Sequence, residues 1–232
     1  VWNGTTYTQS GTYSTNVGSN NNYSMSFDGV DDYVDVGVNS NFLFQNLFSF
    51  EAWVKVPLSP GPQPTGNGAI IGALSGYRFD IYAGNANNGV FYVEFPDLNP
   101  WTVITVMGST DLRDGNWHHL SVTYDGSQVV LYVDGLVEDS SNKTGNISSS
   151  TNAQYPFLIG SANHVGYEDF NGEISNVELW NTALSQQEIQ QYMNCPPIGN
   201  ESGLVGYWNF EEGSGNTALD LTSNGNNGTI NG

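Results

Sequence analysis

Apolar and polar residues alternate along most of this chain with the period of two that is typical of β-strands. Residues 48–56 (FSFEAWVKV) show this most clearly, because Phe, Phe, Ala, Val and Val occupy alternate positions. Glycine, asparagine and proline interrupt the alternation about every ten residues, and the helical period is weak nearly everywhere. The pattern therefore predicts an all-β fold built from short strands.

The remaining strands are predicted from shorter runs of the same kind. Residues 117–135 read as a hairpin with a tight turn at Asp125 and Gly126. The other strand segments are 23–37, 69–74, 77–83, 90–95, 101–107, 157–159 and 173–180. Residues 57–68 carry four prolines and three glycines, so they are expected to form a loop. Residues 140–154 are predicted to form a polar loop.

One short helix is expected near 185–193. Ser185 follows an alternating strand and stands three residues before Glu188. A serine hydroxyl at this position can accept the free amide of the first helical turn, which makes Ser185 an apt N-cap.

Two sequence signatures and their order resemble one known family. Residues 116–126 (NWHHLSVTYDG) lead into a return strand that ends at Gly135, and residues 160–193 join a glycine turn, a strand and the helix. This order is similar to the laminin-G/pentraxin-like jelly-roll modules, and the similarity covers residues 24–193. It implies a concanavalin A-like sandwich of two antiparallel sheets, and it implies a module that binds ligands. The family core positions match Trp53, Trp117, Trp180 and Trp208.

The resemblance also suggests how the chain is divided. Residues 23–194 form the jelly roll, and residues 1–22 form an edge strand or the end of a preceding repeat, similar to those between modules of secreted Bacteroidetes-type multidomain proteins. Residues 195–232 resemble the opening of a module, so the chain either crosses two tandem modules or folds its tail back on one sandwich. We expect the tail to fold back, because its apolar residues need burial. These are Leu204, Val205, Tyr207, Trp208 and Phe210.

Charge and cysteine content narrow the function classes. The chain has 23 Asp and Glu against four Lys and Arg, a formal net charge of −19. Such a field repels nucleic acid and anionic membranes. No apolar run is long enough to cross a bilayer. Cys195 is the only cysteine, so no intrachain disulfide can form. A secreted or cell-surface protein is expected.

The sequence lacks the usual catalytic patterns. A retaining glycosidase on this kind of sandwich needs carboxylates at alternate strand positions, as in Glu-x-Asp-x-x-Glu, and that spacing is absent. The Gly-x-Ser-x-Gly nucleophile motif is also absent. His118 and His119 are neighbours on a predicted strand, so they face opposite sides and cannot chelate one ion together. We therefore expect no enzyme activity.

Calcium is the expected cofactor. Asp28, Asp31 and Asp32 place three carboxylates within one turn, and calcium prefers six to eight oxygen ligands. The family resemblance adds Glu173 to this set, although Ser175 stands where many relatives have an acidic residue. The alternative, in which the aspartates only bond the backbone of their own turn, remains open.

A carbohydrate ligand is expected at the loops. Sugars are bound by aromatic faces together with amide, carboxylate and guanidinium groups. The candidate residues are Tyr77, Arg78, Trp101, Asn163, Tyr167 and Asp169. The sequence thus predicts a non-catalytic, calcium-associated module that binds a polysaccharide or a cell-surface glycan. The alternative is an adhesion or spacer module that contacts proteins or neighbouring modules of the same polypeptide.

Overall fold

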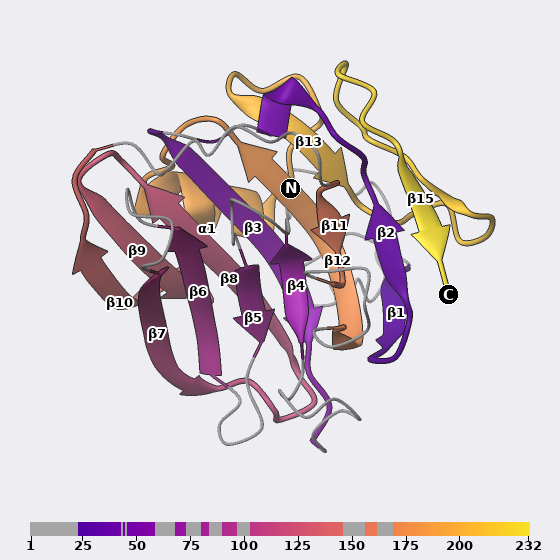
Figure 1. Ribbon diagram of the computed structural model, residues 1–232, viewed down its shortest axis with the longest axis horizontal. Helices are drawn as coiled ribbons and strands as arrows, with labels where there is room; N and C mark the ends of the chain where they lie inside the picture. Colours follow the sequence, from indigo (N-terminus) through magenta and orange to yellow (C-terminus); the bar gives the residue numbers. More distant parts are fainter. Residues whose placement is uncertain are drawn as a thin grey trace, which may run out of the picture.

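Two antiparallel sheets face each other in a computed structural model of the chain, and they enclose one apolar core (Figure 1). The structure describes residues 23–42, 44, 46–58, 68–72, 80–83, 90–96, 103–145, 156–161 and 169–232. The alternation predicted the β-strands, and the family resemblance implied the two-sheet jelly-roll sandwich. The two-layer arrangement confirms this fold class.

The first sheet contains the longest alternating segments. Within the described ranges its strand order is β1 (Met25–Asp28), β12 (Asn171–Trp180), β3 (Phe48–Lys55), β8 (Trp117–Tyr124), β9 (Gln128–Val133) and β10 (Leu136–Asn142). A further strand, β13 (Leu204–Trp208), also pairs with β12. β12 therefore pairs with strands that lie far from one another in the sequence, namely β1, β3 and β13.

The second sheet covers the core from the other side. Its order, again for the described part of the chain, is β14 (Thr217–Ala218), β15 (Gly228–Asn231), β2 (Tyr33–Asp35), β11 (Leu158–Ile159), β4 (Ala69–Gly72), β5 (Asp80–Ala83), β6 (Val90–Pro96) and β7 (Val103–Asp111). The short helix η1 (Ser40–Phe42) lies between β2 and β3 along the chain.

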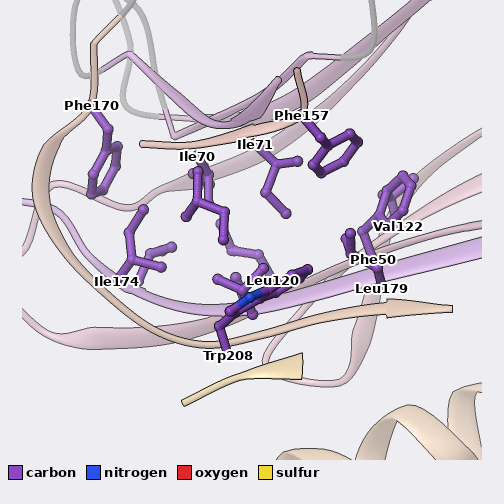
Figure 2. Close-up of a cluster of buried hydrophobic side chains, with 14 of the residues drawn as sticks. Phe50, Ile70, Ile71, Leu120, Val122, Phe157, Phe170, Ile174, Leu179 and Trp208 are labelled. Carbon is purple, nitrogen blue, oxygen red and sulfur yellow. The ribbon is translucent and has the colours of Figure 1, made fainter. Parts of the chain in front are cut away.

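Apolar side chains from both sheets fill the space between them. Figure 2 shows Leu120, Val122 and Leu179 of the first sheet opposite Ile70 and Ile71 of the second. On β3, Phe48, Phe50, Ala52 and Val54 point into this core, as the alternation predicted.

The outer face of β3 is buried as well. Residues 48–54 are buried on both sides, because α1 (Gln186–Asn194) and the segment after it cover the first sheet from outside. The covering contacts form a second apolar cluster. Its buried members are Tyr132, Trp180, Leu184, Ile189, Leu204 and Tyr207. The first sheet is therefore a middle layer, and its outward side chains need partners as much as its inward ones do.

The helix begins where its sequence indicated. The Ser185 hydroxyl accepts the Glu188 amide, and the Glu188 carboxylate accepts the Ser185 amide at 2.7 Å. This reciprocal capping box satisfies two amides that the first turn leaves free. At the other end, Tyr192 stacks on Trp180 of β12 with ring centroids 4.7 Å apart. None of the helices in the described residues is long and apolar enough to cross a membrane.

The carboxyl-terminal segment contributes strands to both sheets. β13 joins the first sheet, and β15 joins the second through β2. Trp208 is fully buried in the main core, and its indole nitrogen donates to the Asn226 carbonyl at 3.0 Å. The apolar residues of the tail therefore lie on the same sandwich as residues 23–194. Residues 1–22 lie outside the described part of the chain.

One predicted loop starts later than expected. Residues 140–142 continue β10 and pair with β9, where the Gln128 amide reaches Ser140 and Asn142 at 3.4 Å. β10 lies at the edge of the sheet, and most of its residues are exposed. A polar edge strand has no apolar alternation, and this is why the hydrophobic pattern missed it.

Candidate functional site

Three aspartates gather at the turn between β1 and β2. One oxygen from each of Asp28, Asp31 and Asp32 lies within 4.8 Å of the others. We call this group the acidic turn. Its side chains also hold the backbone, because Val30 donates to Asp28 at 2.8 Å and Asp28 donates to Asp32 at 2.9 Å. These two hydrogen bonds occupy one oxygen each of Asp28 and Asp32, and the three carboxylates have six oxygens in all.

Asp169 is a further carboxylate near the acidic turn, close enough to interact with the charges of its three aspartates, but it is not one of the group whose oxygens lie within 4.8 Å of one another. Antiparallel pairing of Asp28 with Asn171 brings the residues before Asn171 next to the turn that follows Asp28. Asp169 is 2% exposed, and its Oδ2 atom has no hydrogen-bond partner among the described residues. The backbone approaches closely here, because a Cβ on Gly68 would overlap the Asp169 carbonyl.

The electrostatics of this corner favour a cation. Burial raises the pKa of Asp169, although the Ser161 hydrogen bond opposes this, and the charges of the three turn aspartates raise it further. Burial raises the pKa of Asp32, and the charges of Asp28 and Asp31 add to the effect. A buried, unpaired carboxylate is costly unless it is protonated or paired with a cation. The donor set, all hard oxygens, fits calcium.

Glu173 lies outside this group. Its carboxylate forms an ion pair with Lys55 at 2.8 Å and accepts the Ser24 hydroxyl at 2.8 Å. Burial raises the pKa of Glu173, but the Lys55 and Ser24 contacts outweigh it, and the pKa lies below its usual range. In the sheet, Glu173 pairs with Ser26, two residues from Asp28. The Glu173 carboxylate is therefore already paired with the ammonium group of Lys55.

Most of the predicted sugar-binding residues lie outside the described part of the chain. These are Tyr77, Arg78, Trp101, Asn163 and Tyr167. The sixth, Asp169, is buried beside the acidic turn and does not present its carboxylate to solvent. No local sequence signal places it with the metal residues, because the strand register that pairs Asn171 with Asp28 is set by the tertiary structure.

A second carboxylate group lies under the helix, and sequence reasoning missed it. Glu51 of β3 and Glu178 of β12 are direct neighbours in the sheet, and they are 1% and 3% exposed. We call them the buried acidic pair. The Ser121 hydroxyl donates to Glu51 at 2.7 Å, and Glu51 and Glu178 also share a hydrogen bond. Their positions on the outward face of an alternating strand resembled those of solvent-exposed residues.

The buried acidic pair holds protons. Burial raises the pKa of Glu51 to about 8, and burial together with the Glu51 charge raises the pKa of Glu178 well above its usual range. The nearest base is His119, whose Nε2 atom lies 3.8 Å from Glu51. Burial lowers the pKa of His119 to about 4, so it stays neutral near pH 7. α1 and its neighbours cover this site, so both carboxyls are buried from solvent.

The two adjacent histidines face different surroundings, as their strand positions predicted. His119 is buried against Trp53, with ring centroids 5.2 Å apart. His118 lies between two aspartates, 2.9 Å from Asp134 and 3.3 Å from Asp114. Neither histidine belongs to a group of potential metal ligands in the described residues.

Comparison with known proteins agrees with the architecture. A family model described as the concanavalin A-like lectin/glucanases superfamily matches residues 27–190. Among curated proteins, pappalysin-1 of Mus musculus is 36% identical over 91 residues, which are 38% of this chain and 5% of that protein. The chain thus spans a small part of this relative.

Two solved structures share the sandwich. The first is a proposed carbohydrate-binding protein of Bacteroides ovatus, with 24% identity, a TM-score of 0.66, and coverage of 90% of this chain and 58% of that chain. The second is the CBM40 of a Ruminococcus gnavus sialidase bound to α2,3-sialyllactose. It has 12% identity, a TM-score of 0.58, and coverage of 74% and 98%. At these identities the likeness shows the shared fold.

Proposed function

The chain belongs to the concanavalin A-like lectin/glucanase superfamily, and from this membership we propose that it is a non-catalytic carbohydrate-binding module. The observation that carries the proposal is that the same sandwich occurs in a proposed carbohydrate-binding protein over 90% of this chain. The CBM40 bound to sialyllactose adds support, because it shares the fold over nearly its whole length. The two neighbouring carboxyls that could resemble a glycosidase pair are closed off under α1.

The proposed glycan contacts are the aromatic, amide and guanidinium side chains of the loops. They are Tyr77, Arg78, Trp101, Asn163 and Tyr167. Trp101 offers the largest flat apolar surface in this set, and such surfaces bind the C–H faces of sugars. The amides and Arg78 would bind hydroxyls or a carboxylate.

We further propose that calcium binds at the acidic turn with Asp169 as an additional ligand. The support is the unpaired, buried Oδ2 atom of Asp169 beside three carboxylates that lie within 4.8 Å of one another. Asp169 takes the place first expected of Glu173, whose carboxylate is bound by Lys55. When bound, calcium would neutralise repulsion at this corner and join β1, β2 and the start of β12.

The full-length protein is proposed to be secreted or displayed at a bacterial cell surface, with residues 23–194 as the module and 195–232 as its closing tail. The acidic composition favours this location over one that contacts nucleic acid or anionic membranes. The second candidate function is an adhesion or spacer module. It is compatible with a module that is one small part of a longer polypeptide, as the matching segment is 5% of pappalysin-1.

A glycan array separates the two candidates. The wild-type protein, with calcium, is expected to bind at least one polysaccharide or glycan, and Trp101→Ala is expected to weaken that binding. Asn216→Ala changes an exposed residue beside β14 and serves as the matched control. Binding to none of the glycans, together with binding to a neighbouring module, would support the adhesion or spacer function instead.

A further inference from the structure

A pocket of about 460 Å³ opens at the end of the sandwich where β3 begins and β12 ends. Its walls come from η1, the segment entering β3, the residue after β12, and β13. The lining residues are Ser40, Asn41, Phe44, Asn46, Leu47, Asn181 and Val205. This size lies within the range of pockets that bind small ligands. We call it the amide pocket.

The polar groups of the amide pocket are free to bind a ligand. The side-chain amides of Asn41, Asn46 and Asn181 form no hydrogen bond with the described residues, and all three residues are exposed. Each amide carries both a donor and an acceptor. A sugar hydroxyl also donates and accepts, so three amides around one pocket suit a set of adjacent hydroxyls. The buried side chains of Phe44 and Val205, with Leu47 at 45% exposure, add apolar surface.

The walls are held in place before any ligand binds. Phe42 donates to the Asn39 carbonyl at 3.1 Å, which closes the η1 turn, and the Asn39 side chain bonds to that of Asn226. Asn226 in turn donates to the Val205 carbonyl at 2.9 Å. On the other side, the backbone amide of Asn181 donates to the Gly203 carbonyl at 2.8 Å. A preformed pocket reduces the ordering cost of binding.

The charge of the pocket selects a neutral ligand. The chain carries a net charge of −19, yet none of the described residues that line this pocket is acidic or basic. A sulfated or carboxylated sugar would find no cation there, and a cationic ligand would find no carboxylate. The pocket is therefore a neutral surface on an acidic protein.

The amide pocket is remote from the acidic turn. Asn181 follows the last residue of β12, whereas Asp28 pairs with the first, Asn171. At about 3.3 Å per residue, the ten-residue strand separates the two by roughly 30 Å. Calcium at the acidic turn could not contact a ligand in this pocket.

From these observations we propose that the amide pocket is a binding site for a neutral saccharide unit, independent of calcium at the acidic turn. The assignment deepens the proposed carbohydrate-binding function and rests on it. Asn41, Asn46 and Asn181 bind the hydroxyls, and the exposed apolar surface of Leu47 receives the C–H face of the sugar ring.

The test uses an array of neutral oligosaccharides, including arabinotriose and cellotriose, with 3′-sialyllactose as the anionic probe. The proteins are wild type, Trp101→Ala, the triple variant Asn41→Ala/Asn46→Ala/Asn181→Ala, and the control Asn216→Ala. Loss of three hydrogen bonds is expected to weaken neutral-glycan binding by about tenfold or more, with no change on adding chelator. Calorimetry on the best neutral glycan gives the Kd, and thermal melts verify that the triple variant is folded.

The outcomes separate this site from the proposed function. Neutral-glycan binding that survives the triple variant but is lost in Trp101→Ala would overturn the amide pocket and leave the carbohydrate-binding function in place. Binding of 3′-sialyllactose alone would also overturn it. A wild-type protein that binds no glycan would overturn both proposals.

Discussion

The acidic turn and the buried acidic pair both gather carboxylates on the first sheet and its edge, but they handle the resulting repulsion differently. Asp28 and Asp31 of the turn are exposed, and water can screen their charges. Glu51 and Glu178 lie under α1, where the Ser121 hydroxyl donates to Glu51 and the two carboxyls share a hydrogen bond. The first group can attract a cation from solution, whereas the second must keep protons.

Asp169 combines the burial of the buried acidic pair with a position near the exposed carboxylates of the acidic turn. Its exposed fraction is as small as that of Glu51, and like Glu51 it has a carboxylate oxygen without a hydrogen-bond partner among the described residues, but it lies near the exposed aspartates. A cation that enters from the exposed side could reach it. Acidic residues therefore indicate a metal site only where burial and access occur together, and a count of carboxylates in the sequence does not separate these cases.

The largest predicted effect is a loss of stability at neutral and alkaline pH. Glu51 ionises near pH 4.5 in the unfolded chain and at about 8 in the folded protein, so the folded state holds an extra proton between these values. Its stabilising contribution is full below pH 4.5 and is lost as the pH rises through 8. One retained proton corresponds to about 1.4 kcal/mol per pH unit, or about 4 kcal/mol from pH 5 to pH 8.

Urea unfolding at several pH values, with calcium in excess, measures this effect. The double variant Glu51→Gln/Glu178→Gln cannot ionise at these positions and is expected to show a much flatter pH dependence. Wild type and double variant with parallel pH profiles would contradict the assignment of protons to the buried acidic pair.

Removing one carboxyl from each region should sharpen the contrast. Glu51→Ala leaves a cavity and removes the acceptor of the Ser121 hydroxyl and the partner of Glu178, so unfolding at pH 5 should become easier by about 3 kcal/mol. Asp31→Ala, at an exposed position of the acidic turn, should cost less than about 0.5 kcal/mol in the absence of calcium. Equal costs in chemical denaturation would mean that burial does not distinguish the two regions.

Calcium should stabilise the protein by binding at the acidic turn, and it should not bind at the buried acidic pair. For a Kd near 0.1 mM, typical of extracellular modules, about 10 mM calcium would add about 2.7 kcal/mol to the free energy of unfolding. Asp169→Asn should reduce this gain, whereas Glu173→Gln should retain it because that carboxylate already pairs with Lys55. The measurement is the Tm with calcium and with chelator. An unchanged wild-type Tm would contradict the calcium proposal, and loss of the gain in Glu173→Gln would return Glu173 to the ligand set.

The smallest predicted effect concerns His118. When its imidazole ring is protonated, it interacts with both Asp134 and Asp114. The Asp134 hydrogen bond raises the pKa of His118 above its usual value, against burial, and Asp114 adds to the effect. This contribution is present below about pH 6.5 and is lost as the pH rises through the higher folded value. Asp114→Asn should lower the pKa of His118 in an NMR titration and cost about 0.5 kcal/mol or less at pH 5.5, because Asp114 is 45% exposed. A pKa that does not move would contradict this pairing.

The strands, the helix and the aspartates of the acidic turn were predictable from local patterns. Alternation marked β3 and β8, and the spacing of Ser185 and Glu188 marked the start of α1. The three turn aspartates are close in sequence, so their proximity needed no knowledge of the fold. The end of β10 was not predictable in this way, because an edge strand has no buried face to impose apolar alternation.

What the sequence by itself determined is the set of local structures and the family order, since periodicity, turn residues and capping depend on neighbours within a few positions. Only the tertiary structure decided which carboxylates meet. It placed Asp169 beside Asp28, turned Glu173 to Lys55, and covered Glu51 with α1. It also brought Asn41, Asn46 and Asn181 to one pocket. The physical reason is that strand register and layer packing join residues separated by more than a hundred positions, and burial then decides whether a polar group binds a proton, a cation or a ligand.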